Sequence, residues 1–337
     1  MNIKKIKIAV IDTGVDMHDK EMINNLKFDR KLQVENFEEK YKNIDDSISH
    51  GTLCAKTILS ICNDALIYPV KIFDKHGKTN SWNLVDVLQK ILNTDIDIIN
   101  ISASTTNCPY EKELNEVCKK LYEEGKIIVC SHHNGKNNKS SIPTKFDTVI
   151  GVKGIDEVFK DKDYFYNKKN EVQVYGNSKE RFLKFKGNII EFSRNSRAAA
   201  VFSGILANMI KENGYRTYKL EELIMQNSIN NKSSYKYEKP QDIYYDEEKT
   251  QIAKRLVLLI NKEFAVREID LNFLKEYSLL NTFTGIGNHN AYEFLLKINE
   301  EFNINIDYRD IFIYDLDYLN NIIEIIQKNL ISINEII

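Results

Sequence analysis

Three polar residues of this chain, Asp12, His50 and Ser196, together carry the groups needed for nucleophilic attack on an acyl carbon. A serine hydroxyl is a weak nucleophile at neutral pH, and a neighbouring imidazole must remove its proton. A buried carboxylate fixes the tautomer of that imidazole and stabilises the ring once it is charged. If the fold brings the three side chains together, their chemistry is acyl transfer through a covalent intermediate.

Each of these residues stands where a predicted element begins or ends. Asp12 follows an apolar run typical of a first β-strand, so its carboxylate is expected at the top of the sheet. His50 and Ser196 each open an apolar stretch that predicts a helix. Free N–H groups at the start of the Ser196 helix would face an oxyanion, and Asn134, at a strand end, offers a second donor.

The same residues have ordinary structural interpretations. Asp12 can cap the next segment, and His50 can be a helix-start histidine with its polar atoms satisfied. Ser196 is a favourable N-cap, and Asn134 precedes a glycine as in a common turn. Taken jointly, the order Asp, His, Ser and its context favour an active site.

The composition excludes several classes of function. The 337 residues carry 47 Lys and Arg against 49 Asp and Glu, a net charge of −2, with no basic block, so we expect no nucleic-acid partner. No apolar run approaches the ~20 residues of a membrane span, so no membrane association is expected. The five scattered cysteines form no C-x-x-C pair, which indicates free thiols in a reducing cytoplasm.

No cofactor and no metal site are expected. Cys130, His132 and His133 lie close in sequence. Adjacent strand residues point to opposite faces, however, so both imidazoles would seldom reach one ion. A calcium loop of the D-x-[DN]-x-[DN]-G type is not found in the sequence.

Strand-like and helical stretches alternate over the first two hundred residues. The apolar, β-branched runs typical of strands buried on both faces are 6–11, 65–73, 96–104, 126–133 and 148–155. This pattern predicts an α/β fold with a doubly wound, mostly parallel sheet over residues 1–230. A polar, Tyr-rich linker is expected over 231–248, and helical periodicity predicts a small all-helical domain over 249–337.

With these motifs in order, the chain resembles the subtilisin-like serine proteases, or subtilases, from about Lys4 to Ser228. The matching blocks are "VIDTGVD", "HGT", "PVKIFDKHGKTNSWNLVDVL" followed by "DIINIS", "SHHNG", "SIPTKFDTVIGVKG" and "SRAAAVFSG". The resemblance implies that Asp12, His50 and Ser196 are the catalytic triad and that Asn134 is the oxyanion donor. It also implies a backbone edge that pairs with an extended peptide or protein substrate, formed by Ser102, Ala103 and Ser104.

Several residues depart from the family pattern. Arg194 and Asn195 stand where the family usually has Gly-Thr, Ala200 replaces a common proline, and Ser104 replaces a glycine. The two arginines that flank the serine, Arg194 and Arg197, could read an acidic substrate group. The alternative function is a catalytically inactive pseudoprotease that binds a peptide or a partner as a scaffold.

The C-terminal residues resemble an acyl or peptidyl carrier protein whose phosphopantetheine serine is replaced by Asn290. The resemblance implies a domain that docks a protein partner and carries no phosphopantetheine arm. Because only 11 residues precede Asp12, we expect no pro-segment. We therefore expect a cytoplasmic serine endopeptidase, and the resemblance suggests a role in maturing a peptide natural product.

Overall fold

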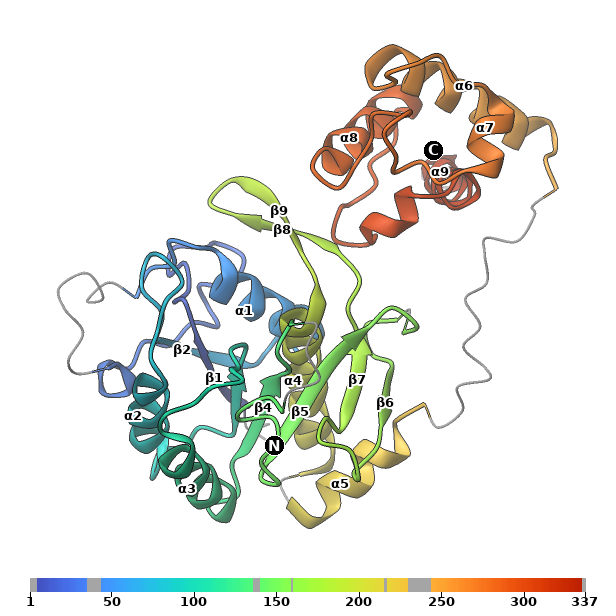
Figure 1. Cartoon of the computed structure of the whole chain (residues 1–337). Helices are drawn as coiled ribbons and strands as arrows, with labels where there is room; N and C mark the ends of the chain where they lie inside the picture. The colour runs from blue at the N-terminus through green and yellow to red at the C-terminus, as the bar shows by residue number, and fades with distance from the viewer. Residues whose placement is uncertain are drawn as a thin grey trace. The chain divides into compact units, whose positions relative to one another are not determined.

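The computed structural model describes residues 5–34, 44–135, 140–158, 160–214, 217–229 and 244–334 (Figure 1). Contacts divide the chain into two units. The first unit contains Met1–Ser178, Lys184–Asn188 and Ser193–Tyr235, and the second contains Lys179–Leu183, Ile189–Phe192 and Lys236–Ile337. Most of the expected linker, 231–248, lies outside the described residues, and the predicted domain boundaries stay a prediction.

A seven-stranded sheet in the order β2-β1-β3-β4-β5-β7-β6 forms the centre of the first unit. All neighbouring strands run parallel except β6, which is antiparallel to β7. The strands are β1 Lys7–Asp12, β2 Leu66–Lys71, β3 Ile98–Ile101, β4 Ile127–Ser131, β5 Val149–Ile155, β6 Tyr164–Tyr166 and β7 Val174–Asn177. The predicted α/β class with a mostly parallel sheet is confirmed. The pair β6 and β7 was not predicted, because both strands are short and lack a continuous apolar run.

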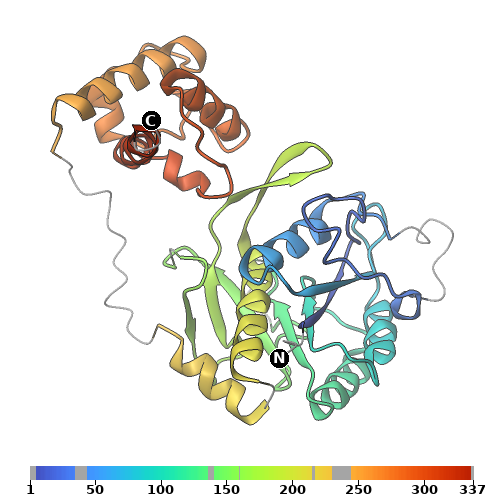
Figure 2. The same cartoon turned by 180° about the vertical axis from the view of Figure 1, so that it is seen from behind.

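Helices cover both faces of this sheet. The helices α2 Ser81–Ile91 and α3 Glu111–Glu123 pack together over one set of strand side chains (Figure 1). On the other face, α1 His50–Ile61 packs against the long helix α4 Arg194–Asn213, and the two lie side by side in Figure 2. A further helix, α5 Thr217–Gln226, follows α4.

The contact between α1 and α4 is close because Gly204 has no side chain. A Cβ atom at Gly204 would lie 2.7 Å from Ile61 Cβ and 2.9 Å from the backbone oxygen of Ile58. Four residues further along α4, Asn208 Nδ2 donates to the Ile61 backbone oxygen over 2.8 Å. Both contacts therefore join α4 to the last turn of α1.

A two-stranded hairpin precedes α4. It consists of β8 Arg181–Phe185 and β9 Asn188–Phe192. Lys186 and Gly187 occupy the two turn positions with φ of 47° and 89°, as a type I′ turn requires. The residues of the hairpin base, 179–183 and 189–192, belong to the second unit.

The rest of the second unit, where the structure describes it, is mainly helical. It contains α6 Glu247–Glu263, α7 Leu271–Glu276, α8 Ala291–Phe302, the 3-10 helix η4 Ile313–Leu316 and α9 Leu319–Asn334. Asp246 and Asp270 cap α6 and α7 by accepting from backbone N–H groups three residues later. The apolar residues that predicted this helical region share one core: Ile252, Leu256, Leu259, Leu295, Ile298, Phe302, Leu319, Ile322, Ile323 and Ile326.

All five cysteines are free thiols, as predicted. Among the helices that the structure describes, none combines the length and the apolar character needed to cross a bilayer.

Replacing Gly204 by alanine tests the α1–α4 contact. Because the backbone of Ile58 cannot move aside, we expect Gly204→Ala to lower the free energy of unfolding of the first unit by about 1–3 kcal/mol. The fluorescence of the single tryptophan, Trp82 on α2, during urea unfolding measures this change. Glu212→Ala, on the exposed part of the same helix, is the control, and an equal midpoint for both variants would contradict the close packing.

Candidate active site

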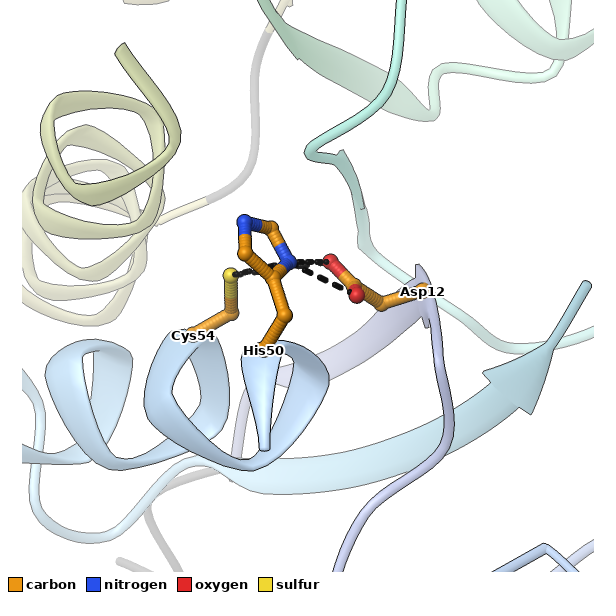
Figure 3. A group of neighbouring side chains, drawn as sticks. All are labelled: Asp12, His50 and Cys54. Atoms are coloured by element: carbon orange, nitrogen blue, oxygen red, sulfur yellow. Dashed lines mark hydrogen bonds and ion pairs between the residues drawn. The ribbon is translucent and has the colours of Figure 1, made fainter. Parts of the chain in front are cut away.

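A carboxylate and an imidazole form the centre of the site (Figure 3). Both carboxylate oxygens of Asp12, the last residue of β1, lie close to His50 Nδ1, at 2.8 and 2.9 Å. Asp12 is 1% exposed, and its Oδ1 also accepts the Thr13 backbone N–H. This geometry holds the proton of the neutral ring on Nδ1 and leaves Nε2 as the basic atom.

The electrostatic surroundings set the pKa of His50. Burial would lower this pKa, but the negative charge of Asp12 and its hydrogen bond outweigh burial and hold the His50 pKa well above the usual value of about 6.5. Cys54, one turn further along α1, lies beside the pair (Figure 3). Burial, assisted by the charge of Asp12, raises the pKa of the Cys54 thiol, so the thiol is uncharged at neutral pH.

A second buried carboxylate, Asp46, organises the start of α1. One of its oxygens accepts Thr13 Oγ1 and the Ser49 backbone N–H, and the other accepts both the backbone N–H and the hydroxyl of Thr52. Ser49 precedes His50 in the left-handed region, with φ of 86°. Asp46 therefore fixes the strained turn that aims His50 at Asp12. The sequence analysis missed Asp46, although an aspartate four residues before the histidine was a usable signal.

Ser196 lies in the first turn of α4 and is 6% exposed. Gly204 lies eight residues after Ser196, and its contacts Ile58 and Ile61 lie eight and 11 residues after His50, so α1 and α4 touch beyond both residues. Within the described ranges, no hydrogen bond joins Ser196 Oγ to His50. Such bonds are often long before a substrate binds, and they shorten in the complex.

The residues just before Ser196 are tied to the sheet. Arg194 has φ of 66°, in the left-handed region, and its N–H donates to the Ser178 backbone oxygen over 2.9 Å. The Asn195 side chain accepts the Gly154 N–H at 2.8 Å and donates to the His132 oxygen at 2.9 Å. Asn195, which the sequence showed only as a departure from a family pattern, thus joins the start of α4 to β5 and to the end of β4.

The predicted substrate-contacting residues line one cavity with the carboxylate–imidazole pair. This cavity of about 400 Å³ is bordered by Asp12 and His50 and by the predicted residues Ser102, Ala103, Ser104 and Asn134. A second cavity of about 940 Å³ shares His132, His133 and Asn134 with the first and also contacts Arg194 and Asn195. His50 and Asn134 therefore border the same space.

One expectation about the site is wrong. Arg197 does not face a substrate, because its side chain is buried, forms an ion pair with Asp161 and donates to the Asn177 backbone oxygen. Arg194 is exposed on the second cavity. Of the two arginines beside Ser196, only Arg194 is placed where it could bind an acidic group of a ligand.

Only one group of side chains in the described ranges could hold a metal ion. It consists of Asp12, His50 and Cys54, whose ligand atoms lie within 4.8 Å of one another (Figure 3). The hydrogen bonds among these three residues account for their approach without an ion. In the described part of the chain, Cys130, His132 and His133 do not converge, and the His132 ring bonds the adjacent backbone instead.

Comparison with known proteins identifies the family. A model of the subtilase family matches residues 3–252, so the chain belongs to the subtilase family. The minor extracellular protease Epr of Bacillus subtilis is 30% identical over 164 residues, which are 46% of this chain and 24% of that protein. The major intracellular serine protease of the same organism is 24% identical over 191 residues, 51% of this chain and 57% of that protein. The chain therefore spans about a quarter of the first relative and somewhat over half of the second.

Solved structures show the same fold. A cold-adapted subtilisin-like serine proteinase superposes with a TM-score of 0.53 at 15% identity, covering 66% of this chain and 81% of that structure. A lanthipeptide protease superposes with a TM-score of 0.54 at 17% identity, covering 65% and 78%. At these identities the likeness concerns the fold.

The raised pKa of His50 predicts the pH dependence of any reaction that uses its neutral form. We expect kcat/KM to rise with pH through an inflection above 6.5, because Nε2 accepts a proton only after the imidazolium has lost its own. Asp12→Asn removes the charge that raises this pKa, so the inflection should move to lower pH while kcat falls on the order of 10⁴-fold.

Cys54→Ala is the control for this profile, since it removes an uncharged thiol. The Cys54→Ala profile should keep its inflection. An inflection of the unmodified protein at or below pH 6.5, or one that Asp12→Asn leaves in place, would contradict the assigned electrostatics.

Proposed function

We propose that this chain is a serine endopeptidase that cleaves an extended peptide through an acyl-enzyme. The observation that carries the proposal is the Asp12–His50 pair, hydrogen-bonded at 2.8 Å, on the cavity that Asn134 also lines. The close packing of α1, which begins at His50, on α4, whose first turn holds Ser196, supports it further.

In the proposed reaction, His50 Nε2 takes the hydroxyl proton of Ser196 as Oγ bonds to the substrate carbonyl carbon. The Asn134 side chain and the Ser196 backbone N–H donate to the resulting oxyanion, and loss of one such donor typically costs about 10²–10³-fold in kcat. The tetrahedral intermediate collapses, and the leaving amine takes the proton from His50. Water then repeats the sequence to release the acid, while Asp12 stays ionised throughout.

The substrate backbone is proposed to pair with the edge at Ser102, Ala103 and Ser104, with side-chain cavities giving selectivity. A cytoplasmic location is proposed from the free cysteines, since buried thiols persist in reducing compartments. Maturation of a peptide natural product is the proposed pathway, and the similarity to a lanthipeptide protease is compatible with it.

The second cavity favours substrates with an acidic group. Lys153, Lys169 and Arg194 line it, and within the described ranges none of these three makes an ion pair. Two carboxylates on the same lining accept hydrogen bonds, Asp156 from Ser178 and Glu171 from the backbone of Ser141, so three cations stand against two anions there. We therefore propose that an acidic side chain or a terminal carboxylate of the substrate binds beside Arg194.

A peptide-binding scaffold without catalysis is the second candidate function. The left-handed Arg194 favours it, because a side chain stands where the family pattern has glycine.

For the C-terminal domain, we propose a carrier-like bundle that docks a partner. Asn290 accepts the Gly287 N–H and donates to the Gly285 oxygen, and an amide cannot bear a phosphopantetheine arm, so the proposed bundle carries none.

Digestion of a defined pool of synthetic peptides tests the peptidase proposal. The unmodified protein should produce new N-termini at a restricted set of sequences, detected by mass spectrometry. Ser196→Ala should abolish them, whereas Ser60→Ala, an exposed serine on α1, should not. Peptide binding without cleavage by the folded protein would support the scaffold instead.

Charge reversal at Arg194 tests the acidic preference. We expect Arg194→Glu to lower kcat/KM for the preferred acidic peptides by about tenfold or more, because a charge-assisted hydrogen bond of about 1.5–3 kcal/mol becomes a repulsion. Amide analogues of the same peptides should change little. Arg194→Lys is the control that keeps the charge. If Arg194→Glu leaves the ranking of the peptides by kcat/KM unchanged, the proposed acidic preference is contradicted.

A further inference from the structure

The base of the β8–β9 hairpin is part of the core of the second unit. Phe182 of β8 is 2% exposed and belongs to the apolar cluster built by α6, α8 and α9. Its ring meets the edge of Tyr292, with centroids 5.7 Å apart. Ile189 of β9 packs against the same cluster, so both strands contribute to this core.

Polar and cation–π contacts reinforce this attachment around Arg181. The Arg181 backbone forms an antiparallel bridge with Phe312, and its guanidinium lies 3.8 Å above the Phe312 ring. Arg181 Nη1 donates to the backbone oxygens of Arg309 at 2.7 Å and Ile311 at 3.3 Å. The Ile313 N–H donates to the Glu180 oxygen at 3.1 Å, which extends the backbone pairing. The hairpin base is thereby fixed by one segment of the C-terminal helical region, 309–313.

The strand fixed in this way leads directly to Ser196. Phe192, the last residue of β9, is only four residues before Ser196 in the chain. The intervening turn, 193–195, closes on Ser178, which immediately precedes the hairpin, through the hydrogen bond from the Arg194 N–H. Only three residues, 193–195, therefore separate the end of β9 from Ser196.

This connecting turn is also strained. A left-handed conformation at a residue with a side chain costs about 1–2 kcal/mol, and Arg194 adopts it with φ of 66°. Strained backbone persists only where its surroundings hold it. The hydrogen bonds of Arg194 and Asn195 hold the C-terminal end of the turn, and β9 leads into its N-terminal end.

We propose that the C-terminal helical region is a positioning module for Ser196, and that it acts through Arg181 and Phe182 at the base of the hairpin. The module holds β9, and β9 holds the left-handed turn that places the Ser196 hydroxyl. Arg181 and Phe182 are positioning residues, since neither belongs to the cavities beside His50. The inference rests on the nucleophilic role proposed for Ser196.

The test compares Arg181→Ala with Arg255→Ala in the full-length protein. Arg255 is a matched control, because its guanidinium lies 4.3 Å from the Phe302 ring and pairs with Glu301 in the same helical region, away from the hairpin. Hydrogen exchange of peptides covering 179–183 and 189–196 is measured together with kcat and KM for a cleaved peptide.

We expect Arg181→Ala to speed exchange at 193–196 and to lower kcat about tenfold or more with KM nearly unchanged, since a small misplacement of a reacting group is costly. Arg181→Lys, which keeps a cation over Phe312, should restore most of kcat. Arg255→Ala should change neither measurement at the turn.

Faster exchange at 179–183 with unchanged exchange at 193–196 and unchanged kcat would overturn the proposal. If Arg181→Ala does not loosen the hairpin, Phe182→Ala, which empties a core position, is judged by the same criteria. If the unmodified protein cleaves no peptide, the exchange data alone decide: faster exchange at 193–196 supports the coupling and leaves only the peptidase assignment refuted.

Discussion

The packing of α1 against α4 is the constraint on which the site depends. A glycine at position 204 lets the two helices approach so closely that a Cβ atom there would lie 2.7 Å from Ile61 Cβ and 2.9 Å from the Ile58 backbone oxygen. This contact lies about two to three turns beyond His50 in α1 and about two turns beyond Ser196 in α4. The sheet then supplies Asp12 at the end of β1, and the two helix starts supply the other two members of the proposed triad.

Backbone strain marks both helix starts. Ser49 and Arg194, the residues that lead into α1 and α4, both lie in the left-handed region, where residues with a side chain are uncommon. Each strained turn is held by buried polar side chains, by Asp46 in the first case and by Asn195 in the second. Strained backbone that is held by buried hydrogen bonds is typical of active sites, where the orientation of a group matters more than its contribution to stability.

The sequence predicted what local patterns determine and missed what distant contacts determine. Asp12 and His50 could be paired because each directly borders an apolar run of its own element. The role of Arg197 could not be predicted, because its partner Asp161 lies in a loop 36 residues earlier. The contact between Arg181 and Phe312 could not be predicted either, since no periodicity relates a five-residue strand to a helical region more than a hundred residues away. Short strands such as β7 lack enough residues to show a pattern.

The central claim is that Ser196 is an activated nucleophile served by His50 and Asp12. Incubation of the folded protein with a fluorophosphonate, followed by mass mapping of the adduct, tests this claim most directly, because only an activated serine reacts rapidly. The account predicts a single adduct on Ser196, absent from Ser196→Ala and formed far more slowly by His50→Ala. No adduct on the folded protein, or an adduct on another residue, would contradict it.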